Sequence, residues 1–166
     1  HFTDRRQRQM CIRDRDYAID GRSQTTSGDP HAAVYISNQV NLKNPATSLK
    51  VLVSAFRDAS ADFRVFYQLI RADGTDTELK YNPFPGFDNL EDTDGDGFGD
   101  NVINSSNNNG RPDAKVIPSL EDEFKEYQFS IDNLEEFIGY KIKIVMSGTN
   151  EAKSPRFKDL RTIALA

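Results

Sequence analysis

The chain is poor in the residues that most often carry catalysis. It has one cysteine and two histidines among 166 residues, and it also lacks tryptophan, so its core must be built from Phe, Tyr, Leu, Ile and Val. The histidines are His1, at the terminus, and His31, in a stretch rich in small polar residues, so neither suggests a Ser-His-Asp or Cys-His arrangement. Acidic pairs such as Glu121/Glu123 and Glu135/Glu136 are typical of solvated surface charge rather than of a glycosidase. We therefore expect a protein that is not an enzyme.

Long apolar runs are also missing. The longest apolar stretch, Tyr140 to Met146, is interrupted by two lysines and is far shorter than the roughly 18 residues of a membrane-spanning helix. The basic start of the chain is not followed by the apolar segment of a signal peptide. The sequence thus predicts no membrane insertion.

The first residues need an explanation of their own. The segment RRQRQMCIRDR (5–15) resembles a transposon-based sequencing adaptor translated in one frame. The alternative is a natural basic tail that binds nucleic acid or a membrane. We interpret residues 1–15 as adaptor-derived and leave this segment out of the fold prediction. On this interpretation the chain is a fragment of a longer protein. Because Cys11 lies in this segment, residues 16–166 cannot form a disulfide or a thiolate site.

Charge argues against one class of partner. Residues 1–15 hold five arginines and two aspartates, so residues 16–166 carry 16 basic and 24 acidic side chains, a formal charge of −8. Such an acidic domain repels phosphates, and no cluster of lysine or arginine with interleaved aromatic residues offsets this. We expect no nucleic-acid partner.

The rest of the chain has the pattern of an all-β protein. Residues 16–32 are rich in Gly, Ser, Thr and Asp and are predicted to be a linker. Short stretches of alternating polarity then follow without any βαβ rhythm, which favours an antiparallel β-sandwich, jelly-roll-like, over residues 33–166, with a long acidic loop insertion at 88–112. The predicted strands are 33–36, 39–42, 48–57, 62–71, 126–131, 140–147 and 160–165.

Two local predictions are sharper. The stretches 48–57 and 62–71 alternate apolar residues on matching faces, and the residues between them have the length of a four-residue hairpin loop, so we expect them to pair. The one helical candidate is Ile131 to Ile138, where Asp132 could cap a short turn.

The acidic insertion contains the only constellation that predicts a ligand by its chemistry. Carboxylates that alternate with glycines repel one another unless a hard cation neutralises them, which predicts a Ca²⁺ site. The pattern resembles thrombospondin type 3 repeats and the first half of an EF-hand loop, but Ile103 stands where an EF-hand needs its bidentate glutamate. The alternative is a solvated acidic insertion without metal. The candidate ligands are Asp92, Asp94, Asp96, the Phe98 carbonyl and Asp100.

Aromatic residues beside the insertion suggest a second candidate site. The segment YNPFPGF holds Tyr81, Phe84 and Phe87 between two prolines and a glycine. Exposed rings on such a segment could stack against sugars. The alternative is that these rings close one end of the sandwich.

Several segments together resemble one family. They are NPATSLKVLVSAFR (44–57), FRVFYQLIRADG (63–74), YNPFPGF (81–87), FKEYQFSIDNL (124–134) and IKIVMSGTNEAKSPRFKDLRTIALA (142–166). The resemblance is to the C-terminal region of large virion structural proteins from contractile-tailed phages of marine cyanobacteria.

That resemblance implies a component of the virion, associated with the tail or baseplate, or otherwise an extracellular protein. Its implied partners are other virion proteins or a host-surface glycan. The resemblance leaves open whether the chain forms a homo-oligomer within the virion. The alternative function is a carbohydrate-binding module of a larger secreted or viral protein.

Overall fold

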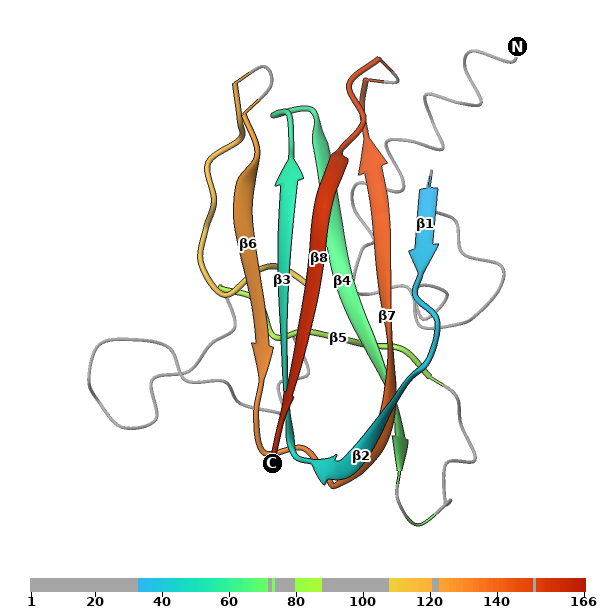
Figure 1. Cartoon of the computed structure of the whole chain (residues 1–166). Coiled ribbons are helices and arrows are strands. Elements are labelled where there is room, and N and C mark those ends of the chain that lie inside the picture. Colours follow the sequence, from blue (N-terminus) through green and yellow to red (C-terminus); the bar gives the residue numbers. More distant parts are fainter. Residues whose placement is uncertain (1–32, 72, 74–79, 88–107, 121–122, 151) are drawn as a thin grey trace, which may run out of the picture.

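A computed structural model describes residues 33–71, 73, 80–87, 108–120, 123–150 and 152–166 (Figure 1). The segments predicted to be adaptor and linker lie outside these residues. Within the described part every regular element is a strand, and none is a helix that could cross a membrane. The strands are β1 (Ala33–Ile36), β2 (Val40–Ala46), β3 (Ser48–Phe56), β4 (Ala61–Arg71), β5 (Asn82–Pro83), β6 (Lys125–Ile131), β7 (Phe137–Gly148) and β8 (Arg156–Leu165).

The strands form two antiparallel sheets that pack face to face. One has the order β1-β7-β4-β5, with β2 also paired to β7, and the other has the order β6-β3-β8. Figure 1 shows how the chain moves from one sheet to the other between consecutive long strands. This alternation is a property of jelly-roll folds. The predicted fold class, an all-β antiparallel sandwich, is confirmed.

The predicted hairpin between β3 and β4 is wrong. β3 pairs with β6 and β8, whereas β4 pairs with β7 and β5, so the two strands belong to different sheets. The connection is a tight turn in which Ala61 N donates to Asp58 O at 3.0 Å and Ser60 N donates to Asp58 Oδ1 at 3.0 Å. Two strands that face each other across a core show the same alternation as two neighbours, because both place every second residue inside.

The predicted helix at 131–138 is also wrong. β6 extends to Ile131 and β7 begins at Phe137, and the corner between them has Asn133 at a φ of 55°. Asparagine accepts this left-handed conformation more readily than most residues. Leu134 N then donates to Thr47 O at 2.8 Å, and its side chain is buried. The bond to Thr47 and the burial of Leu134 favour a corner over a helical turn.

The core between the sheets is built around aromatic rings. Phe63 of β4 meets Tyr127 of β6 edge-on with ring centroids 4.9 Å apart, and Phe157 of β8 in the same way at 5.1 Å. Phe84 contacts Tyr67 at 5.0 Å. Such edge-to-face pairs add to the stabilisation from burying the rings themselves.

A second, smaller core covers the outer face of the larger sheet. Phe66 of β4, Val145 of β7 and Tyr81 are buried together, and the Lys143 ammonium lies 5.3 Å from the centroid of the Tyr81 ring. The chain passes along the edge of the larger sheet at β5, with Tyr81 on the outer face and Phe84 in the main core.

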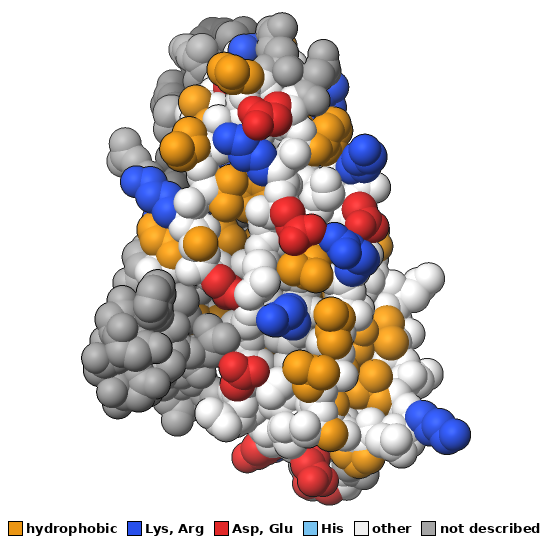
Figure 2. All heavy atoms as spheres, turned by 60° about the vertical axis from the view of Figure 1, so that its left-hand side comes forward, with side chains coloured by type: hydrophobic (Ala, Val, Ile, Leu, Met, Phe, Trp, Pro, Cys, Tyr) orange, Lys and Arg blue, Asp and Glu red, His pale blue; other side chains and the backbone are white. Residues whose placement is uncertain are grey.

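The surface combines paired charges with exposed apolar side chains. Arg161 lies 2.7 Å from Glu126 and 2.9 Å from Asp159, and Figure 2 shows acidic and basic side chains next to one another over the middle of one face, with hydrophobic side chains gathered toward its lower end. The exposed large apolar residues of β1, β2, β7 and β8 are Val34, Tyr35, Ile36, Val40, Ile138, Ile163 and Leu165.

Candidate binding pocket beside the strap

One irregular segment connects the two sheets along the side of the sandwich. We call residues 108–120 the strap. On the larger sheet, Val65 N donates to Gly110 O at 3.0 Å, and Gly110 N donates to Phe84 O at 2.8 Å. On the smaller sheet, Ser119 N donates to Arg57 O at 2.8 Å. The strap is thus fixed at both sheets by backbone hydrogen bonds.

Asp113 holds the middle of the strap. Its Oδ1 accepts from Ser130 N at 2.9 Å, and its Oδ2 accepts from Gln128 Nε2 at 3.1 Å and from the Ser130 hydroxyl. Its backbone N also donates to Gln128 O at 2.8 Å. Burial raises the pKa of Asp113 above its usual value, and the hydrogen bonds from Ser130 and Gln128 oppose that shift.

Gly110 is required where the strap meets β4. Its φ is +75°, and a Cβ placed there would lie 2.9 Å from Val65 O and 3.1 Å from the Cβ of Arg64. Any residue with a side chain would be strained by the backbone conformation and would push the strap away from β4. A glycine at this position therefore determines how closely the strap approaches the sheet.

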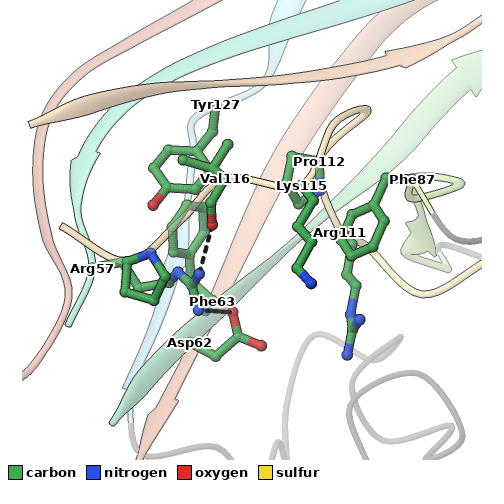
Figure 3. Close-up of a pocket in the computed structure, with 10 residues that line it drawn as sticks. Arg57, Asp62, Phe63, Phe87, Arg111, Pro112, Lys115, Val116 and Tyr127 are labelled. Atoms are coloured by element: carbon green, nitrogen blue, oxygen red, sulfur yellow. Dashed lines mark hydrogen bonds and ion pairs between the residues drawn. The ribbon is translucent and has the colours of Figure 1, made fainter. Parts of the chain in front are cut away.

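A pocket of about 280 Å³ lies between the strap, β4 and the start of β6 (Figure 3). Its walls combine aromatic and proline rings with charged side chains. The lining residues are Arg57, Asp62, Phe63, Phe87, Arg111, Pro112, Lys115, Val116, Pro118 and Tyr127.

Positive charge prevails in the pocket. Arg57, Arg111 and Lys115 line it, and Asp62 is the one carboxylate among its described lining residues. Asp62 lies 3.8 Å from the Arg57 guanidinium and 3.2 Å from Arg64 Nε, so two arginines share its charge. This excess of cations contrasts with the formal charge of −5 of the whole chain.

The cations differ in how firmly the fold holds them. Arg57 Nη2 donates to Val116 O at 2.9 Å, and Nη1 donates to Ala61 O at 3.4 Å, so its guanidinium also fastens the strap to the turn before β4. Arg111 stacks over the Phe87 ring with its Cζ 5.5 Å from the centroid. Lys115 is exposed, and Figure 3 shows it beside Arg111 and Phe87, across the pocket from Arg57.

At the inner side of the pocket, the Tyr127 hydroxyl is buried and has no hydrogen-bond partner among the residues that the structure describes. Its ring packs against Phe63, and the residue is 2% exposed. The pocket floor is therefore aromatic and apolar, with the cations nearer the opening.

Most of the residues predicted to form sites are not among those that the structure describes. The predicted calcium ligands Asp92, Asp94, Asp96, Phe98 and Asp100 fall outside the described residues, and no group of metal-binding side chains occurs among those that the structure describes.

The predicted aromatic platform is not formed by Tyr81 and Phe84. These residues are 1% and 0% exposed, because Tyr81 packs in the outer core and Phe84 packs in the main core. Only Phe87, at the rim of the pocket, is partly exposed. The alternative interpretation, rings buried within the sandwich, fits Phe84, whereas Tyr81 is buried on the outer face of the larger sheet.

Comparison with known proteins gives little further information. No family model and no curated protein sequence matches the chain. Among solved structures, a chain in the structure of the infectious bursal disease virus Gt strain matches with a TM-score of 0.40 and 14% identity. The match covers 86% of this chain and 28% of that one. The VP2 subviral particle of the same virus matches with a TM-score of 0.33 and 15% identity over 85% of this chain and 26% of that chain. Both TM-scores are too low to support a conclusion about this chain.

Proposed function

We propose that this chain is a non-enzymatic structural or adhesive domain of a virion, carried by a tail or baseplate protein of a contractile-tailed phage. The observation behind the proposal is that the segments with the family resemblance are the framework of one folded unit. They include β3, most of β4, all of β6 and β8, and residues 81–87 with the edge strand β5. The resemblance therefore concerns a whole domain rather than scattered motifs.

The location can be tested by immunogold electron microscopy. Antibodies raised against the full chain would be applied to purified contractile-tailed cyanobacterial phage whose virion protein contains these segments. Label at the tail end is the expected result. Label on the head would contradict a tail or baseplate position, and label found only in the particle-free lysate would contradict a virion component. Pre-absorption of the antibody with the purified chain is the control.

The second candidate function is a carbohydrate-binding module of a larger secreted or viral protein. It is favoured by one observation, the partly exposed Phe87 ring at the rim of a pocket that also holds charged groups. Binding to glycans together with absence of label from particles would favour this candidate over the first.

Calcium binding by residues 92–100 stays a prediction. A ligand that binds only the folded chain must raise its unfolding temperature. We expect calcium to raise the melting temperature of the full chain relative to chelator, and Asp94→Ala with Asp96→Ala to abolish the rise. An equal melting temperature in millimolar calcium and in chelator would leave an acidic segment without a metal.

A further inference from the structure

We propose that β8 forms the contact of a symmetric dimer, in which its outer edge pairs antiparallel with β8 of a second copy of this chain. The three-stranded sheets of the two copies would then join into one continuous sheet across the contact. The proposal goes beyond the proposed function and does not rest on it, since such a dimer can form whether or not the domain belongs to a virion.

The outer side of β8 is an edge of the smaller sheet. The order of that sheet is β6-β3-β8, and β8 pairs with β3 on one side, while no strand of the described part of the chain pairs with its other side. Figure 1 shows β8 running along the length of the sandwich, and its ten residues include neither proline nor glycine. A long strand edge of this kind presents a row of N–H and C=O groups that a second strand can bind.

The other edges of the two sheets are each protected. On one side of the larger sheet β1 has four residues and β2 contains Pro45, and on the other side β5 consists of Asn82–Pro83 alone. The strap occupies the outer edge of β6, because Asp113 N donates to Gln128 O and Asp113 Oδ1 accepts from Ser130 N. Short strands, prolines and covering loops prevent strands of different chains from pairing. Among the described residues, β8 has none of these devices.

The side chains of β8 leave apolar surface for a further strand to cover. Leu160 and Ala164 pack against the main core but are only partly buried, whereas Val51, beside them on β3, is completely buried. On the outer face of the sheet, Ile163 and Leu165 are 42% and 51% exposed. A strand paired with β8 would cover part of each of these four side chains, and burial of apolar surface drives most association between proteins.

The charges of β8 are already paired within one copy. Arg161 Nε lies 2.9 Å from the Asp159 carboxylate, and Arg161 Nη2 lies 2.7 Å from that of Glu126. The proposed contact uses backbone groups and apolar side chains, so it needs none of these three residues to give up its partner. Because the cation and the carboxylates neutralise one another, they also repel a second copy little.

The strand is complementary to itself in one register. The pairing of β8 with β3 shifts between Phe157 and Asp159, so the regular part of the strand is 159–165. A two-fold axis through Thr162 pairs the whole of this part, with Leu160 opposite Ala164 of the partner subunit. Arg161 then lies opposite the partner's Ile163.

Other arrangements are less favourable. An axis through Asp159 or Arg161 would place like charges directly opposite each other, as would a parallel pairing in register, and such pairs are destabilising. An axis nearer the end of the strand would pair fewer residues. This fit between two identical strands is the reason to expect a second copy, because a two-fold contact brings the same surface together from both subunits.

Sedimentation velocity of the full chain tests the proposal, over concentrations from about 1 to about 300 μM. A reducing agent is needed, because Cys11 would otherwise be able to link two chains through a disulfide. We expect a monomer–dimer equilibrium with a dissociation constant in the micromolar range, since one pair of strands buries less surface than a standard interface. Amide hydrogen exchange in β8 should slow as the concentration rises, whereas exchange in β1 should stay constant.

Two variants at one position test the register. Ile163→Lys places a cation opposite the partner's Arg161 at both ends of the two-fold contact and should raise the dissociation constant at least about tenfold. Ile163→Glu removes the same apolar side chain but places an anion there, so it should dimerise about tenfold more tightly than Ile163→Lys. Melting temperatures measured at low concentration establish that both variants are folded.

Ile36→Lys is the matched control. Ile36 is 39% exposed on the edge strand β1, so the same substitution there should leave dimerisation like that of the wild type.

Four outcomes would overturn the proposal: a monomer at every concentration, equal dimerisation of Ile163→Lys and Ile163→Glu, a loss of dimer confined to Ile36→Lys, or slowed exchange in β1 instead of β8. A monomer that nevertheless binds a strand of another protein would also contradict a contact between two copies. None of these outcomes changes where the immunogold label falls, so failure of the dimer and failure of the virion location are distinguishable.

Discussion

Replacing Gly110 by alanine should loosen the strap and destabilise the domain. The φ of +75° would place alanine in a left-handed conformation, at a cost of about 1 kcal/mol. The new Cβ would meet backbone, 2.9 Å from Val65 O and 3.2 Å from Val65 N, which no rotamer change can relieve. Moving the strap away would weaken the hydrogen bonds of Gly110 to Phe84 and Val65, each contributing about 1 kcal/mol. The sum is about 3 kcal/mol.

Urea denaturation followed by circular dichroism measures this loss directly. A chain of this length loses about 3 °C of melting temperature per kcal/mol, so thermal unfolding should shift down by about 9 °C. Gly86→Ala is the matched control, because Gly86 also has a positive φ, of +93°, but its Cβ would first meet the Asn109 side-chain oxygen. That side chain can move, so we expect a loss of about 1–2 kcal/mol. A loss for Gly110→Ala below about 0.5 kcal/mol, or equal losses in both variants, would refute the reasoning.

Three further predictions concern buried polar groups. Burial raises the pKa of Tyr67 from 10.0 to about 12. The stabilisation that Tyr67 contributes is therefore complete below pH 10 and is lost as pH rises toward 12. Tyr67→Phe should remove the tyrosine ionisation that occurs at the highest pH in an absorbance titration. Burial raises the pKa of Asp113 above 3.8, so the stabilisation that Asp113 contributes declines as pH rises. The urea midpoint of Asp113→Asn should therefore rise relative to that of the wild type between about pH 4 and pH 7. A constant difference between the two proteins would contradict this. Tyr127→Phe removes a buried hydroxyl without a partner and should leave the free energy of unfolding equal or raise it by about 1 kcal/mol, whereas a clear loss would reveal a hydrogen bond to that oxygen.

Strand positions could be predicted well from the sequence because alternation is a local signal. Lys125–Ile131, for example, buries Tyr127, Phe129 and Ile131 in the main core on one face, and the pattern is visible without any knowledge of the partners. The sequence predicts a strand that begins at Tyr140, whereas β7 begins three residues earlier, at Phe137. Phe137 is fully buried against Tyr140, a contact that only the folded chain creates.

Which strands pair is not a local property. Val51 and Val53 of β3 and Val65 of β4 are all completely buried, and that pattern fits neighbours in one sheet as well as strands in opposite sheets. The distinction lies in partners far along the chain. Val51 pairs with Phe129 and Thr162, and Val65 pairs with Ile144.

The pocket could not have been predicted for the same reason. Arg57 follows the end of β3, Lys115 belongs to an irregular segment and Tyr127 lies in β6, so no spacing connects them. The predictions concerning Tyr81 and Phe84 failed because proline and glycine indicate a bend without indicating which side of it is solvated. Only Phe87, the last ring of that segment, reaches the pocket.

The interleaving of the two sheets along the chain also determines how the domain must fold. Its first described strand pairs with β7, as in Ala33 with Met146, and β3 pairs with β8, as in Ser48 with Leu165. Each of these pairings closes a loop that spans most of the domain, and the chain entropy of that closure is lost before the contacts form. Domains dominated by such distant pairings fold slowly, on a timescale of roughly milliseconds to seconds. The larger sheet cannot form until β7 is present, and the smaller sheet cannot be completed until β8 is present, so the nascent domain exposes its aromatic core until synthesis reaches β8.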